Sequence, residues 1–191
     1  MGQPLRILAP VAFLLVSACD RGVEERNADN SNAAVDGLED EAANTDAAKS
    51  LDTQSFVDNA AASDMYEIEA GKLASEKASN SELKAYGQML VTDHTKSSAE
   101  MKAAAAETPP GVMPPTSLPT DKQAKIDELK AASGADFDRL FLAQQVEAHT
   151  AALKLLEEYG SGGEAPALRE FASRTAPVVQ GHLARAKSLQ K

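Results

Sequence analysis

Three histidines and one glutamate are the residues whose types and positions could do chemistry. The chain contains only three histidines. Each lies on the apolar face of a segment with helical periodicity, when successive residues are projected at about 100°. Imidazoles together with a carboxylate suit Zn, and imidazole also suits Cu and Fe. One chemistry that this set could perform is therefore the binding of one divalent transition metal ion (Zn, Cu or Fe) by Glu67, His94, His149 and His182.

Two other interpretations fit the same four residues. In the first they form a buried polar network, where Glu67 accepts a hydrogen bond from His94 and the other imidazoles are satisfied by Gln145, Thr175 or water. In the second they are the active site of a metal-dependent or redox enzyme. The residue types and spacing leave all three interpretations open.

The sequence argues against several other kinds of site. Di-iron bundles use Glu-x-x-His motifs to supply bridging carboxylates. Here the residues three positions before the histidines are Val91, Val146 and Val179, which cannot bind a metal. No Gly-rich phosphate loop, CxxC pair or nucleophile elbow is present. We therefore expect a binding or accessory module and not an established type of enzyme.

The segments that must position these residues are helices. Helical periodicity predicts helices over residues 53–78, 80–106, 120–131, 135–159 and 165–189. Two capping boxes, Ser79 with Glu82 and Thr120 with Gln123, mark two of the helix starts. Between the second and third segments, "ETPPGVMPPTSLP" excludes helix, because proline lacks the amide hydrogen and restricts the preceding residue.

The predicted fold class is all-α. An extended Pro-rich connection of this length covers about 40 Å, enough to cross a bundle from end to end. We predict a four-helix, ferritin-like up-down-down-up bundle with a long Pro-rich crossover that carries a short extra helix. An up-down-up-down order is the alternative, since a long connection can also loop back.

Helix lengths place three of the four residues at one depth. Glu67 and His94 lie at nearly equal distances from the turn near Asn80. In the ferritin-like order His149 lies about 21 Å from the same end of the bundle, level with both. Counted from the second hairpin, His182 lies about 10 Å from His149 along the axis. His182 therefore fits the site least well.

The N-terminal residues predict the cellular location of the protein. Arg6 precedes the apolar run "ILAPVAFLLVSA", which is too short to span a bilayer and typical of a signal peptide. The run ends in "LVSAC", which resembles the lipobox of bacterial lipoproteins. We expect residues 1–18 to be a signal peptide and Cys19 to be lipidated. The alternative is a plain signal peptide that leaves Cys19 as a free thiol.

The composition of the rest of the chain predicts its division into a tether and a folded domain. Residues 19–52 are predicted to be the lipidated Cys and a disordered acidic tether, because they hold too few large apolar residues to offset ordering entropy. Residues 53–191 are the bundle domain. The net charge of −10 argues against nucleic-acid binding. The partner expected is the membrane, through the lipid anchor, and the sequence identifies no protein partner.

The bundle domain resembles a bacterial family known as the domain of unknown function 4142 family, often labelled as outer-membrane proteins. The resemblance implies a ferritin-like bundle, recurrent polar positions at Glu67, His94, His149 and His182, and no established activity. The matching stretches are "SFVDNAAASDMYEIEAGKLA", "ELKAYGQMLVTDHTKSSAEM", "DFDRLFLAQQVEAHTAALKLLEEY" and "LREFASRTAPVVQGHLARAKSL".

These observations together predict a lipid-anchored protein of the bacterial cell envelope, with its domain in the periplasm or otherwise outside the cytoplasm. We expect a binding or stress-related accessory module that holds one divalent metal ion in the bundle core. The alternatives are a metal-dependent or redox enzyme that uses the same residues, and a structural scaffold with a buried His/Glu network.

Overall fold

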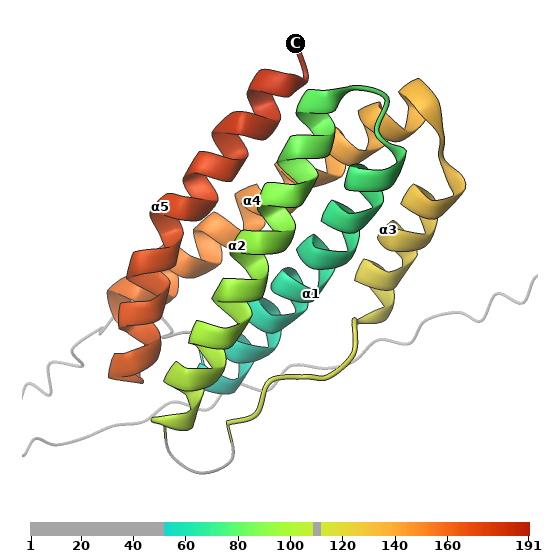
Figure 1. Ribbon diagram of the computed structural model, residues 1–191. Helices are drawn as coiled ribbons and strands as arrows, with labels where there is room; N and C mark the ends of the chain where they lie inside the picture. The colour runs from blue at the N-terminus through green and yellow to red at the C-terminus, as the bar shows by residue number, and fades with distance from the viewer. Residues whose placement is uncertain (1–51, 109–111) are drawn as a thin grey trace, which may run out of the picture. The chain divides into compact units, whose positions relative to one another are not determined.

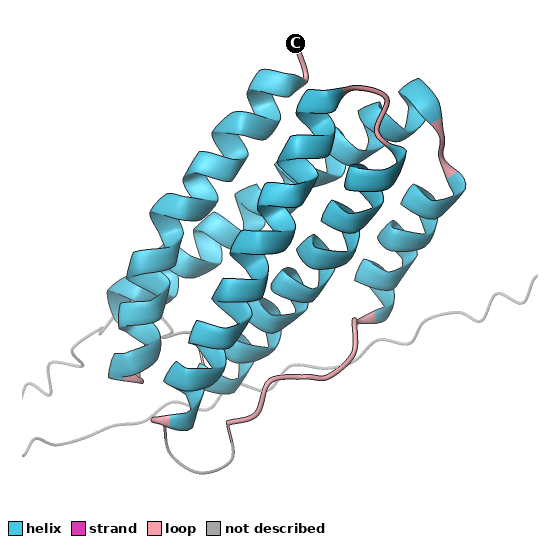
Figure 2. Ribbon diagram, in the orientation of Figure 1, coloured by secondary structure: helices cyan, strands magenta, loops and turns pink. Residues whose placement is uncertain are grey.

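A computed structural model describes residues 52–108 and 112–191. The predicted signal peptide, Cys19 and nearly all of the tether therefore lie outside the described residues. The described part of the chain is all-helical and contains no strand (Figure 2). None of its helices is both long enough and apolar enough to cross a membrane. The all-α prediction is confirmed.

Four long helices and one short helix make the fold. They are α1 (Thr53–Lys77), α2 (Ser81–Ala106), α3 (Thr120–Ala131), α4 (Gly134–Gly162) and α5 (Pro166–Leu189). α1 pairs with α2 and α4 pairs with α5, and the two hairpins pack together through α1–α4 and α2–α5 contacts. α1 and α5 run in one direction and α2 and α4 in the other (Figure 1). This is the predicted up-down-down-up order, with α3 on the crossover beside α1.

The helix starts differ from two sequence predictions. Asn80, and not Ser79, caps α2, because its side chain accepts a hydrogen bond from the amide of Leu83. Ser79 instead donates from its amide and hydroxyl to the carboxylate of Asp138. α3 begins at Thr120 after Pro119 and has no side-chain cap. A partner from another helix thus outweighs the local capping motif at Ser79.

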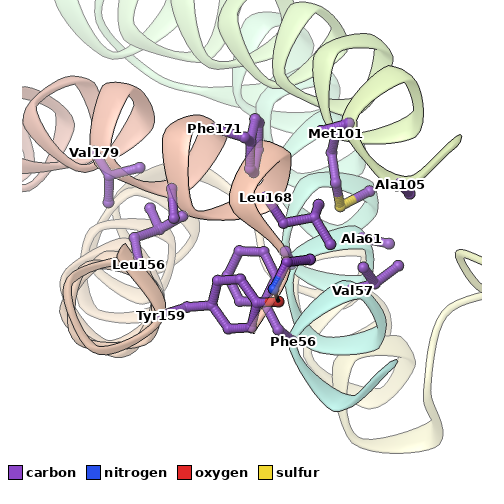
Figure 3. Close-up of a cluster of buried hydrophobic side chains, with 14 residues drawn as sticks. Phe56, Val57, Ala61, Met101, Ala105, Leu156, Tyr159, Leu168, Phe171 and Val179 are labelled. Carbon is purple, nitrogen blue, oxygen red and sulfur yellow. Dashed lines mark hydrogen bonds between the residues drawn. The ribbon is translucent and has the colours of Figure 1, made fainter. Parts of the chain in front are cut away.

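Two apolar clusters fill the bundle core, one toward each end. The first surrounds the stacked rings of Phe56 and Tyr159, whose centroids lie 3.9 Å apart, and includes Leu168 and Met101 (Figure 3). The members of the second are spread over α1 to α5: Tyr66, Ala70, Ala74, Ala78, Leu83, Tyr86, Leu90, Ile126, Leu129, Phe137, Phe141, Leu142 and Ala186. Burial of these side chains holds the four helices in register at both ends.

α1 and α2 approach each other closely at two glycines. A Cβ added to Gly87 would lie 2.6 Å from the Gly71 carbonyl oxygen, and one added to Gly71 would lie 2.7 Å from the Gly87 carbonyl oxygen. Neither backbone atom can move without separating the helices. Glycine is therefore required here by the distance between the two backbones, one turn from Glu67.

We expect Gly87→Ala to destabilise the protein by about 1–3 kcal/mol, because the added methyl group forces α1 and α2 apart. The measurement is the free energy of unfolding in urea, followed by circular dichroism. Gly181→Ala on α5 is the matched control. No atom lies within 4 Å of its added Cβ, so helix propensity should stabilise that variant by about 0.5–1 kcal/mol. Equal effects of the two substitutions would contradict the close packing.

Candidate metal centre

A polar layer separates the two apolar clusters. On α2, His94 lies between Leu90 of one cluster and Met101 of the other. On α4, His149 lies between Leu142 and Leu156 in the same way. The helix register that aligns the apolar clusters therefore also aligns the histidines.

The three imidazoles meet in this layer. The ring centroids of His94 and His149 are 5.7 Å apart, those of His94 and His182 5.4 Å, and those of His149 and His182 5.3 Å. The three side chains can each direct one nitrogen so that all three nitrogens lie within 4.8 Å of one another. All three residues are at most 4% exposed. Three helices thus place three imidazoles around one point in the core.

A fixed acceptor orients each ring. His94 Nδ1 lies 2.8 Å from Asp64 Oδ1, and His182 Nε2 lies 2.9 Å from Asp93 Oδ2. His149 Nδ1 lies 2.9 Å from the carbonyl oxygen of Gln145, one turn back on α4. A carbonyl or carboxylate oxygen accepts, so the proton of each neutral imidazole sits on that nitrogen. The other nitrogen of each ring then carries a lone pair.

The second nitrogen of each ring has no partner among the described residues. Nε2 of His94, Nε2 of His149 and Nδ1 of His182 are buried and make no hydrogen bond with any described residue. Buried polar atoms without a partner are rare in proteins and destabilising. Metal-binding histidines characteristically direct one nitrogen to the ion and donate from the other to a carboxylate or carbonyl. The three rings have that arrangement.

Burial and charge set the protonation of the rings. Burial, reinforced by the charge of His94, lowers the pKa of His149 to about 4. Burial also lowers the pKa of His182, although its hydrogen bond to Asp93 opposes this. For His94 the effect of burial is outweighed by the hydrogen bond to Asp64 and the charge of Glu67, so its pKa is raised. At neutral pH His149 and His182 are therefore uncharged, the form of imidazole that binds metals.

Glu67 is a buried carboxylate beside this set. It is 1% exposed, and neither of its oxygens makes a hydrogen bond with a described residue. Its Oε1 lies 3.7 Å from Nδ1 of His149. Burial raises the pKa of Glu67, and the charge of His94 opposes that rise. The group of nitrogens within 4.8 Å of one another comprises the three histidines and does not include Glu67.

The predicted 10 Å displacement of His182 is wrong. The sequence placed the end of the third long helix at Tyr159 and the start of the fourth at Ala165, whereas α4 continues to Gly162 and α5 begins at Pro166. Because α4 is longer, His149 and His182 lie at more similar distances from the turn that joins α4 and α5. Their offset along the helix axis therefore falls to about 4.5 Å. Side-chain length covers that difference. Gly160 and Gly162 are helical, although glycines just after the predicted helix end are typical of a turn.

The predicted pairing of Glu67 with His94 is also wrong, because Asp64 accepts from His94 instead. At about 100° per residue, Asp64 projects onto the flank of α1 and Asp93 projects to the side of the apolar stripe of α2. In a four-helix bundle each helix contacts two neighbours, so each of these flanks also faces an adjacent helix. Asp93 faces α5 in this way and reaches His182. The positions of Asp64 and Asp93 relative to the neighbouring helices, and not the apolar stripe alone, indicate that they can contact the histidines.

Comparisons with known proteins agree with this fold. The model of the family described as domain of unknown function (DUF4142) matches residues 38–189, which confirms the resemblance found in the sequence. No curated protein gives a significant match.

Two solved structures are similar to the chain. "CopM in the Cu(II)-bound form" has a TM-score of 0.60 and 21% sequence identity, over 73% of this chain and 96% of that one. "CopM in the Cu(I)-bound form" has a TM-score of 0.58 and 21% identity, over 72% of this chain and 94% of that one. At this identity the likeness supports the helical fold.

Proposed function

We propose that this chain, which belongs to the DUF4142 family, is a copper-binding module of the bacterial cell envelope. The observation that carries the proposal is the convergence of three buried, unpartnered imidazole nitrogens, one from each of three helices. The proposed ligands are Nε2 of His94, Nε2 of His149 and Nδ1 of His182. Glu67 supplies negative charge beside them.

The donor set favours copper among the divalent metals. No cysteine lies in the described part of the chain, so the ligands are nitrogens, which suit Cu, Zn, Ni and Fe. For a given set of nitrogen ligands, affinity rises along the first-row metals to Cu²⁺ and falls again at Zn²⁺. The similar proteins described as Cu(I)-bound and Cu(II)-bound support the same choice.

Three nitrogen ligands leave a bound ion room for a further ligand. Glu67, a water molecule or a ligand from a partner could occupy that position. The protein's own contribution is to fix the three rings through Asp64, Asp93 and the Gln145 carbonyl, and to exclude bulk water from the layer. Such a site suits binding and delivery of copper.

We expect Cu²⁺ to raise the melting temperature of the purified protein, because an ion that binds only the folded state stabilises it. At a free ion concentration one hundred times Kd the gain is about 2.7 kcal/mol, which corresponds to a rise of several degrees. The measurement is thermal unfolding with and without Cu²⁺ and then with excess chelator, which should reverse the rise. A melting temperature unmoved by Cu²⁺, Zn²⁺ and Fe²⁺ would instead favour the buried polar network.

The envelope location rests on the N-terminal sequence. Cys19 follows the apolar run and the small residues Ser17 and Ala18, and multiple acyl chains on one residue anchor a protein stably. We expect Cys19→Ala to move the protein from the membrane fraction to the soluble fraction of a bacterial lysate. Ser17→Ala keeps a small residue before the cysteine and should leave attachment unchanged. Membrane retention of the Cys19→Ala variant would contradict the lipid anchor.

A further inference from the structure

A groove lies on the α2–α5 face, and one of its lining residues contacts a histidine of the site. It has a volume of about 240 Å³. Asp93, Ser97 and Thr175 lie in its lining. Asp93 faces the groove and also accepts the hydrogen bond from His182 Nε2. One residue therefore links the groove directly to a proposed ligand.

A smaller cavity shares lining residues with this groove. Its volume of about 20 Å³ is enough for one water molecule. Its lining includes His94 and Asp64, together with Ser97 and Thr175. The last two residues line both spaces, so their side chains form the boundary between the groove and the cavity. Both carry a hydroxyl group that can replace a water oxygen around a cation.

The charges in the groove favour a cation despite two basic residues there. Lys96 forms an ion pair with Glu100, and Arg174 forms one with Glu170. The remaining charged group of the lining is the Asp93 carboxylate, whose side chain is 37% exposed. A cation that enters the groove thus meets a carboxylate that contacts His182 and forms no ion pair with a lysine or arginine of the described residues.

The α1–α4 face offers a second opening to the same cavity. A groove of about 340 Å³ there shares Ser63, Ala152 and Leu155 with the cavity. Two of these three boundary residues are apolar. The carboxylate in its lining, Glu158, pairs with Lys154 and contacts no histidine among the described residues. This opening therefore offers a cation fewer oxygen ligands.

We propose that copper ions enter and leave the histidine site through the α2–α5 groove, with Asp93 as the first anionic contact and Ser97 and Thr175 as the passage. This inference rests on the proposed copper-binding function. Asp93, Ser97 and Thr175 then act in metal exchange without being ligands themselves.

The test blocks each of the two openings to the cavity separately in the purified protein. Ser97→Leu and Thr175→Leu fill the α2–α5 boundary, and Ala152→Leu, also partly buried, fills the α1–α4 boundary as the matched control. The association of Cu²⁺ and its removal by a coloured chelator are followed by stopped-flow absorbance. We expect each α2–α5 variant to slow both rates by about tenfold or more while Kd changes little. The control should exchange copper at the rate of the unmodified protein.

Two results would overturn the route. One is unchanged exchange rates in both α2–α5 variants; the other is slower exchange in Ala152→Leu than in either of them. Melting curves without metal identify any variant that is misfolded, and the second α2–α5 substitution then carries the test. Failure of the unmodified protein to bind copper at all would overturn the proposed function and the route together, whereas tight binding with unaltered rates would overturn only the route.

Discussion

His149→Gln should lower the affinity for Cu²⁺ by more than about 100-fold. Loss of a residue that only orients a ligand typically weakens metal binding 10–100-fold, and His149 is proposed to be a ligand itself. Its hydrogen bond goes to Gln145 of its own helix, so the substitution breaks no hydrogen bond between helices. Isothermal titration with Cu²⁺ in competition with a chelator of known affinity measures the change.

A matched control lies two residues away on the same helix. Glu147 is largely exposed and pairs with Lys125, so Glu147→Gln should leave copper affinity within about threefold, as expected for a screened surface charge. Asp64→Asn should give an intermediate loss of about 10–100-fold, because it removes the negative charge of the group that accepts from His94 and orients its ring. If His149→Gln bound copper as tightly as Glu147→Gln, the proposed ligand set would be wrong.

Glu67→Gln should have opposite effects on the metal-free and copper-bound protein. Without metal, the buried carboxylate has no hydrogen-bond partner among the described residues, and removing its charge should stabilise the fold by about 1–3 kcal/mol at pH 7. With copper, loss of a negative charge beside the ion should weaken binding by about tenfold or more. Urea unfolding and competitive copper titration measure the two effects.

The stability effect of Glu67→Gln should depend on pH. Burial raises the pKa of Glu67 in the folded protein, so the folded state retains a proton that the unfolded state has lost. The contribution of Glu67 to stability is therefore present below its ordinary pKa of 4.5 and is lost as pH rises through the folded value. The advantage of the Gln variant should grow across that interval and then level off.

A second carboxylate on the same helix provides the comparison. Glu69 is about half exposed and pairs with Lys72, so Glu69→Gln should change stability by less than about 0.5 kcal/mol. If Glu67→Gln destabilised the metal-free protein as well, the carboxylate would have a stabilising partner, and the buried network would be the better interpretation.

Helical periodicity was sufficient to predict a helical bundle, and the length of the Pro-rich connection permitted the up-down-down-up order without excluding up-down-up-down. It also predicted that the three histidines face inward, since each replaces an apolar residue on such a stripe. It misjudged the depth of His182 because glycines at 160 and 162 suggested a turn where α4 continues. Tertiary packing overrides weak local propensity there.

The residues that orient the rings could not be read from the stripes. Asp64 and Asp93 lie on helix flanks, and whether a flank faces solvent or a neighbouring helix depends on the packing of the whole bundle. The same limit applied to Ser79, which a local motif assigned as a cap and which binds Asp138 of α4 instead. Which side chains pair between helices depends on how each helix is rotated about its axis. Helical periodicity alone does not give that rotation.

The most direct test is to locate copper in the protein itself. Crystals grown with Cu²⁺ and measured at the copper absorption edge should show one dominant anomalous peak inside the bundle, about 2.0–2.1 Å from Nε2 of His94, Nε2 of His149 and Nδ1 of His182, as usual for metal–imidazole bonds. Copper found only on surface carboxylates, with an empty or water-filled space between the three rings, would contradict the account.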